Sequence, residues 1–151
     1  MTRVEFRLSI ALASVFFVSA ALAAPATDGG KAVIDPVSGL KWTAGAVPQV
    51  STCAAEGDMA KGASHFFLKY AAGFVTPPHL HSADHYAAMV SGTLVLIVDG
   101  KEHRLAPGSY FSLTGKKVHT ARCEGSEDCV IFLDARGPWD VVMVDKTPPK
   151  N

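Results

Sequence analysis

Half of the chain's histidines fall within seven consecutive residues. The sequence of 151 residues has six histidines, and the stretch PHLHSADH holds three of them, His79, His81 and His85. Imidazole binds divalent transition metals readily, so histidines gathered in one short segment predict a metal site. The alternative is a set of surface or packing histidines, and their spacing bears on the choice.

The spacing of these histidines favours a strand followed by a bend. Residues two apart point about 200° apart on a helix, but they share a face on a strand, and Pro77 and Pro78 oppose a helix. On an unbroken strand His85 would lie about 13 Å beyond His81, out of reach of the same ion. We therefore expect a bend at residues 82–84 that brings His85 onto a neighbouring strand beside the first two histidines.

A fourth ligand has to come from another segment. His103 lies among charges in GKEHRL, on an expected edge strand, and His65 precedes a strand with no histidine near it. His119 follows SLTGKKV, a turn that would start a new strand inside the β region. His119 is therefore the best candidate, although local spacing alone does not select it.

The chain segments that carry and surround these histidines are typical of β-structure. After residue 23, no stretch keeps helical periodicity for three turns. Turn signals recur about every 8–12 residues, as in an all-β sandwich or barrel. Asp99-Gly100 is a strong hairpin signal. A chain of this length predicts one domain. The expected strand regions are SHFFLKYAAGF, HYAAMVSGTLVLIVDG, KEHRLAPGSYFSLTG, VHTARC, CVIFLDA and WDVVMVD.

The histidine segment resembles the first motif of the cupin family, small β-barrel proteins in which two short motifs carry a metal site. That motif is G-x5-H-x-H-x3-E-x6-G. The chain matches its fixed positions with Gly73, His79, His81, His85 and Gly92. The spacing is complete, with one departure, because His85 stands where the family usually has glutamate.

The second family motif, G-x5-P-x-G-x2-H-x3-N, is matched less fully. Gly108 and His119 stand at its first glycine and its histidine. The proline, the second glycine and the asparagine are replaced by Thr114, Lys116 and Cys123. The resemblance therefore implies His119 as the fourth metal ligand.

The resemblance covers roughly residues 57–144 and implies an all-β fold. That fold is the cupin-type conical β-barrel, a jelly-roll-like double-stranded β-helix, with the ligands inside its mouth. A four-histidine set is a known variation in the family, so the implied cofactor is one divalent transition metal: Mn, Fe, Ni, Cu or Zn. Four neutral imidazoles leave the metal's charge uncompensated, which favours anionic or enolate-like ligands in the open positions.

Three further residues near the motifs are less informative. Met89 lies four residues after His85 and so on the same face of its strand, and it is expected to line the pocket. Phe111 is a second candidate. For both residues the alternative is plain barrel core. Asp84 either holds an imidazole N–H or serves the turn.

Two of the three cysteines form a candidate disulfide. Cys123 and Cys129 bracket a polar five-residue loop. If the flanking segments pair as a hairpin, the Cα atoms come within disulfide range, about 4.4–6.8 Å. The alternative is two buried thiols. Cys53 has no evident partner, and the sequence assigns it no role.

The N-terminal residues are typical of a signal peptide. Arginines precede an apolar run over residues 8–24, and Ala21 and Ala23 give the small-x-small pattern of a cleavage site. We expect cleavage after Ala23 and a periplasmic or secreted mature protein. The alternative is an uncleaved membrane anchor, because about 17 apolar residues can just span a bilayer.

The sequence divides into a signal peptide (1–23), an N-terminal arm or linker (24–50), a cupin barrel (51–145) and a C-terminal tail (146–151). The chain has 14 basic and 14 acidic residues, so it lacks the charge that nucleic acid or an anionic membrane surface requires. The expected partner is a small molecule, with no membrane contact once the signal peptide is cleaved. Family analogy adds a homodimer through residues 24–50, since open sheet edges favour pairing.

These observations lead to two main functional hypotheses. The first is an exported mononuclear metalloenzyme of oxidoreductase type, such as a dioxygenase, acting on a small diketone, phenolic or carboxylate compound. No residue is placed as a general base, which weakens the enzyme hypothesis. The second is a non-catalytic periplasmic cupin that holds a metal or small anion, and a third is a degenerate cupin with a structural role. Fold does not decide between them, because function depends on the site.

Overall fold

Two β-sheets make up most of the computed structural model, which describes residues 31–144. The strands belong to one compact unit that begins at Ile34. The predicted signal peptide (1–23) and tail (146–151) lie outside the described residues. Within residues 31–144, no helix has the length and apolar character needed to cross a membrane.

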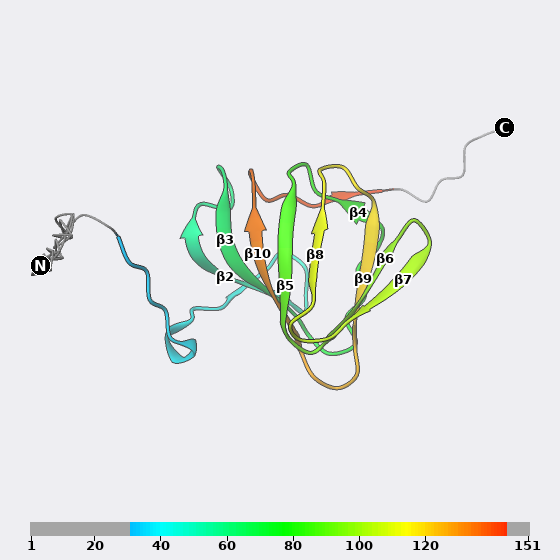
Figure 1. The fold of residues 1–151 in the computed structure, drawn as a ribbon, viewed down its shortest axis with the longest axis horizontal. Coiled ribbons are helices and arrows are strands. Elements are labelled where there is room, and N and C mark those ends of the chain that lie inside the picture. The colour runs from blue at the N-terminus through cyan, green and yellow to red at the C-terminus, as the bar shows by residue number, and fades with distance from the viewer. Residues whose placement is uncertain (1–30, 145–151) are drawn as a thin grey trace, which may run out of the picture. The chain divides into compact units, whose positions relative to one another are not determined.

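Each sheet is built from antiparallel neighbours (Figure 1). The six-stranded sheet has the order β1 (Thr43–Ala44), β2 (Val50–Gly57), β3 (Ser64–Tyr70), β10 (Cys129–Ala135), β5 (His85–Ser91) and β8 (Tyr110–Leu113). The five-stranded sheet has the order β11 (Val142–Met143), β4 (His79–Leu80), β9 (His119–Glu124), β6 (Thr93–Val98) and β7 (Lys101–Leu105). A short 3-10 turn, η1 (Val37–Gly39), precedes the strands. The all-β architecture of antiparallel strands predicted from the sequence is confirmed.

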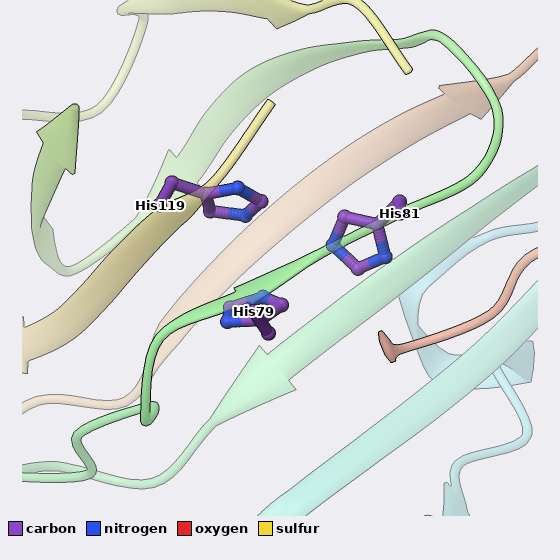
Figure 2. A group of neighbouring side chains, drawn as sticks. All are labelled: His79, His81 and His119. Atoms are coloured by element: carbon purple, nitrogen blue, oxygen red, sulfur yellow. The ribbon is translucent and has the colours of Figure 1, made fainter. Parts of the chain in front are cut away.

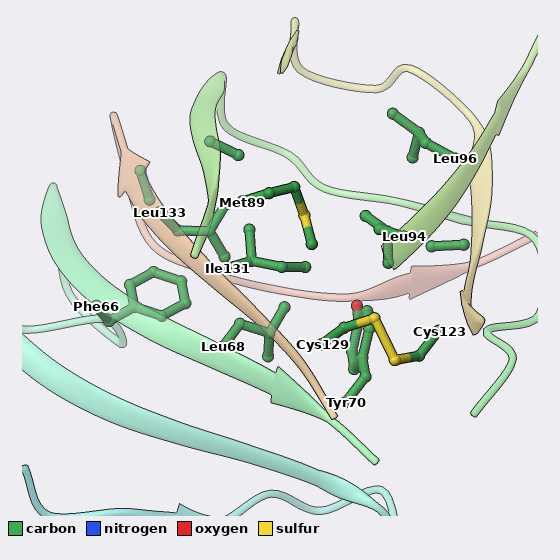
Figure 3. Close-up of a cluster of buried hydrophobic side chains, with 13 residues drawn as sticks. Phe66, Leu68, Tyr70, Met89, Leu94, Leu96, Cys123, Cys129, Ile131 and Leu133 are labelled. Carbon is green, nitrogen blue, oxygen red and sulfur yellow. A yellow bond between two sulfur atoms is a disulfide. The ribbon is translucent and has the colours of Figure 1, made fainter. Parts of the chain in front are cut away.

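The core lies between the sheets because alternate residues of each strand point inward. Strands β3, β9 and β10 alternate strictly between buried and partly buried residues. Burying an aliphatic or aromatic side chain contributes about 1.5–3 kcal/mol relative to leaving it exposed. Figure 3 shows the inward side chains that meet in this way, among them Phe66, Leu68, Met89, Leu94, Leu96, Ile131 and Leu133.

Tight turns set the strand register. The hairpin prediction at Asp99-Gly100 is confirmed, since β6 pairs with β7 across it and both residues have positive φ, 52° and 74°. Gly92, the last glycine of the first motif, has φ 72°, and a Cβ there would lie 2.6 Å from the carbonyl oxygen of Asp128. Glycine is therefore required where β5 turns into β6 beside the start of β10.

The last predicted strand is shorter than the sequence indicated. Within the described part of WDVVMVD, residues 139–144, only Val142–Met143 is a strand, pairing with β4, while Trp139 and Asp140 lie in the loop before it. The register explains the difference, because β4 itself has only two residues and offers no longer partner. The loop residues that are thereby freed contact the histidines.

Candidate metal centre

The histidines of the first motif come from both sheets and from the bend between them. His79 lies in β4, opposite His119 of β9 in the five-stranded sheet. His81 follows β4, and His85 begins β5 in the six-stranded sheet. The bend expected at residues 82–84 is present, but it carries His85 to the facing sheet rather than to a neighbouring strand. All four side chains are buried, with 3–6% of their surface exposed.

The bend packs against the turn between β8 and β9. The Gly115 N–H donates to the Asp84 carboxylate at 2.7 Å, and the Lys116 N–H donates to the His81 carbonyl oxygen at 2.7 Å. A Cβ on Gly115 would lie 2.4 Å from the Ser82 carbonyl oxygen, so only glycine allows this approach. Asp84 thus bonds the facing turn, and this contact fixes the segment before His119 against the segment before His85.

Three of the four imidazoles converge closely. Figure 2 shows the rings of His79, His81 and His119 directed into one space, and each offers a nitrogen within 4.8 Å of the others. Their ring centroids lie 4.3 Å apart for His79–His119, 5.1 Å for His79–His81 and 5.3 Å for His81–His119. His85 lies next to this group, with its ring centroid 4.9 Å from that of His81 and 6.1 Å from that of His119.

Backbone carbonyl groups orient the three converging rings. The Nδ1–H groups of His79 and His119 donate to the carbonyl oxygens two residues earlier, those of Pro77 and Lys117, at 2.9 Å each. The Nδ1–H of His81 donates to the carbonyl oxygen of Asp140. A protonated Nδ1 leaves the lone pair on Nε2, which is the arrangement found when histidine ligates a metal.

Burial keeps these imidazoles uncharged near neutral pH. Desolvation, helped by a smaller contribution from the neighbouring histidines, lowers the pKa of His81 to about 3 and that of His119 to about 4. Desolvation also lowers the pKa of His79 and of His85. Neutral imidazole is the form that binds a metal, so the cluster does not have to lose protons first.

His85 differs from the other three histidines in its hydrogen bonding. Its Nδ1 is buried and has no hydrogen-bond partner among the described residues. An unpaired buried polar atom costs about 1–3 kcal/mol, which a bound ion or ligand in contact with the ring would offset. The three converging neutral imidazoles of His79, His81 and His119 fit a divalent transition metal, whereas His85 is adjacent but lies outside the group whose ligand atoms are all within 4.8 Å of one another.

The two remaining histidines lie elsewhere. His103 is exposed on β7. His65 lies on the outer face of β3, 3.4 Å from a carboxylate oxygen of Glu56 and 3.7 Å from one of Asp134. Neither is grouped with the buried histidines.

A small apolar cavity adjoins the histidines inside the barrel. Its volume is about 30 Å³, and it is lined by Leu68, Tyr70, His81, His85, Leu94, Leu96, Phe111, His119, Ala121, Ile131, Leu133 and Trp139. Phe111 lies on this wall, whereas Met89, which we expected there, is 3% exposed in the core and is not a lining residue. Tyr70 provides the only hydroxyl group of the lining, and burial raises its pKa to about 12.

Sequence reasoning missed two residues of the site, Trp139 and Asp140. The Trp139 indole stacks on His81 with ring centroids 3.9 Å apart and an angle of 21° between the planes. The Asp140 carboxylate accepts hydrogen bonds from the N–H and the hydroxyl group of Ser82, at 2.7 and 2.5 Å. These residues were placed on a predicted strand, and the only local signal against it was the turn-forming Gly137-Pro138 immediately before them.

The two cysteines of the polar loop are joined in the structure. Cys123 and Cys129 form a disulfide with Cα atoms 5.6 Å apart, and Figure 3 shows it among apolar side chains beside Tyr70. Cys53 is a buried free thiol.

Comparison with known proteins agrees with this architecture. A family model described as "Cupin domain" matches residues 66–135. This span includes all four buried histidines and the disulfide. No curated protein matches the chain.

Solved structures of similar fold are distant in sequence. KdgF from Halomonas sp. is 22% identical, with a TM-score of 0.58 over 72% of this chain and 94% of that chain. The polyketide cyclase RemF from Streptomyces resistomycificus is 18% identical, with a TM-score of 0.64 over 79% of this chain and 88% of that one. An oxalate oxidase is 15% identical, with a TM-score of 0.57 over 85% and 74%. At these identities the likeness concerns the fold.

Proposed function

The chain belongs to the cupin superfamily, and on that premise we propose that it binds one divalent transition metal through His79, His81, His85 and His119. The observation that carries the proposal is the orientation of the imidazoles. Three Nδ1–H groups are donated to backbone carbonyls, which leaves three Nε2 lone pairs directed into one buried space. Imidazole suits Zn, Cu, Fe and Ni, so the donor set does not select one metal.

His85 is the proposed fourth ligand. Its ring lies against His81 and its Nδ1 has no partner among the described residues. It takes the place of the glutamate usual at this position of the motif, so the site contributes no negative charge of its own. A small anionic or enolate ligand therefore suits the open coordination positions.

We propose further that the protein is a metalloenzyme of oxidoreductase type, similar to a dioxygenase, acting on a small oxygen-donor compound. A bound metal would supply a Lewis acid and a template for the reactants. The chain's own contribution is a small cavity next to the histidines, lined by aliphatic and aromatic side chains, and such walls would limit the access of bulk water to the reactants. Oxidase chemistry occurs on this fold in the similar oxalate oxidase, but RemF is a cyclase, so fold alone does not choose the reaction.

One observation favours a second candidate function, a non-catalytic cupin that holds a metal or a small anion. The lining of the cavity contains no carboxylate, and its one hydroxyl group, on Tyr70, stays protonated at physiological pH. No lining group is thus poised as a general base, apart from the histidines proposed as ligands.

We also propose that the mature protein is exported and works in the periplasm or outside the cell, after cleavage behind Ala23. The Cys123–Cys129 disulfide supports this proposal, because disulfides persist in oxidising compartments and are rare in the cytosol. A homodimer through the N-terminal arm (24–50) is part of the same proposal. Ile34 and Val37 support it, since 82% and 87% of their surface is exposed.

Elemental analysis of tag-free protein tests metal binding, and oxygen consumption tests catalysis. We expect close to one transition-metal ion per chain, and oxygen uptake with at least one member of a panel of small diketones, phenols and carboxylates. A protein without near-stoichiometric metal would be a degenerate cupin with a structural role. A protein that binds metal but gives no turnover with Fe, Mn, Cu or Ni would contradict the oxygenase assignment and leave the binding function.

A further inference from the structure

The Trp139 side chain forms part of the cavity wall and touches two of the proposed metal ligands. Its ring is stacked on His81 and meets the His85 ring edge-on, with centroids 5.2 Å apart and an angle of 89°. It also meets the ring of Phe66 in the core, edge-on with ring centroids 5.2 Å apart. The indole therefore fills the space between the histidines and the core.

Hydrogen bonds to distant segments hold the backbone that carries this indole. The backbone N–H of Trp139 donates to the Met59 carbonyl oxygen at 2.7 Å. The next residue, Asp140, accepts from the Nδ1–H of His81 through its carbonyl oxygen and from Ser82 through its carboxylate. Trp139 thus stacks on the face of the His81 ring and Asp140 accepts from its Nδ1–H. The Asp140 carboxylate also binds Ser82, at the start of the bend that follows His81.

The cavity that this wall bounds has room for very few atoms. Its volume is about 30 Å³, and one water molecule needs roughly 10–15 Å³ measured in this way. Most other walls are side chains of core strands, such as Leu94, Ile131 and Leu133, which cannot move without disturbing the packing. Trp139 lies in a loop, so it is the wall whose size can be changed with the least disturbance to the core.

The charge of the lining adds a second restriction. The lining has no acidic and no lysine or arginine side chain, and a bound divalent ion would make the space positive. A single small anion, or a small neutral molecule such as dioxygen, therefore suits it, whereas an aromatic ring does not fit beside the indole.

We propose that Trp139 is a specificity-determining residue that limits direct ligands of the metal site to molecules of about two to four non-hydrogen atoms. This inference rests on the proposed metal-binding function. It narrows the substrate class, because dioxygen or a small carboxylate can reach the site with the indole stacked on His81. A phenolic or aryl compound can reach it only when Trp139 is displaced.

Carboxylates of increasing size test this limit with the donor group and charge held constant. Formate, acetate, propionate and benzoate are titrated into the Co²⁺-loaded protein, and the visible Co²⁺ absorption reports coordination. In the wild type we expect benzoate to bind at least tenfold more weakly than formate. In Trp139→Ala the difference in affinity between formate and benzoate should fall to about threefold, and in Trp139→Phe it should lie between these two values. Trp42→Ala, which removes the chain's other tryptophan, is the control and should keep the wild-type gap.

The outcomes separate this inference from the function on which it rests. Metal content is measured first for every protein, and a wild type that retains no Co²⁺ contradicts both proposals. Co²⁺ retention with equal affinity for formate and benzoate in the wild type contradicts only the size limit. An affinity difference between formate and benzoate that stays at the wild-type value in Trp139→Ala would likewise contradict only the size limit. If Trp139→Ala does not fold, the wild-type series and Trp139→Phe still decide the question.

Discussion

Strand β9 begins in one kind of site and ends in another, and the two ends are held by different forces. At its start His119 joins histidines from three segments, and hydrogen bonds to backbone carbonyls orient the rings. Toward its end Cys123 is bonded covalently to Cys129, only six residues away, inside an apolar core. At the histidine end, oriented imidazoles are available to bind a ligand, whereas at the other end the disulfide links β9 to β10 covalently. Metal affinity and fold stability should therefore respond to different residues.

The largest expected effect is the loss of stability of the metal-free protein in acid. Below pH 6.5 the unfolded chain binds protons on His81 and His119, while the folded protein does not until its lower pKa values, about 3 and 4, are reached. The free energy of unfolding should thus fall with falling pH by about 1.4 kcal/mol per pH unit for each of these histidines. Urea unfolding between pH 7 and 5 measures it. A flat profile would contradict the burial of neutral imidazoles, and His119→Ala should give a shallower slope.

Removing one proposed ligand should separate metal affinity from stability. In His119→Ala we expect the affinity for Zn²⁺ or Co²⁺ to fall at least about 100-fold, since loss of even a supporting partner of a ligand costs 10–100-fold. Calorimetric titration measures the affinity, and His103→Ala, on exposed β7, is the matched control. Near-wild-type affinity in His119→Ala would remove this residue from the site.

Breaking the disulfide should give the opposite result. For the double variant Cys123→Ala with Cys129→Ala we expect a loss of about 2 kcal/mol in the free energy of unfolding, because a short closed loop restricts the unfolded chain. Metal affinity should stay within about threefold of the wild type. A loss of affinity as large as that of His119→Ala would show that the two ends are not independent.

The smallest expected effect concerns the turn before β9. Lys116 has φ 67°, a left-handed conformation that costs a side-chain-bearing residue about 1 kcal/mol. Lys116→Gly, which restores the glycine of the family motif, should raise the free energy of unfolding by up to about 1 kcal/mol. Metal affinity should not change. Lower stability after this substitution would mean that the lysine side chain contributes contacts that outweigh the backbone strain.

Much of the fold could be predicted from the sequence because its signals are local. The alternation in SHFFLKY and CVIFLDA indicated strands with one buried face, and Asp99-Gly100 indicated a hairpin. The convergence of His79 and His81 followed from the period of a strand. His119 was the best of the remaining histidines and the family resemblance supported it, but local spacing could not select it, because its pairing with His79 depends on sheet register.

The rest of the site could not be predicted because it depends on contacts between distant segments. Trp139 stacks on a histidine 58 residues earlier in the chain, and nothing in the local sequence reports that contact. The spacing of the motif likewise could not indicate that the bend carries His85 to the facing sheet. Long-range packing, rather than propensity, decides both features.

An anomalous-difference map of crystals of the metal-loaded protein would show whether the four buried histidines hold one ion. We predict one strong peak between the sheets, at about 2.0–2.1 Å from a ring nitrogen of each of the four buried histidines, if the metal is zinc. A peak held elsewhere on the protein, or one that the ring nitrogens of His119 do not reach, would contradict it.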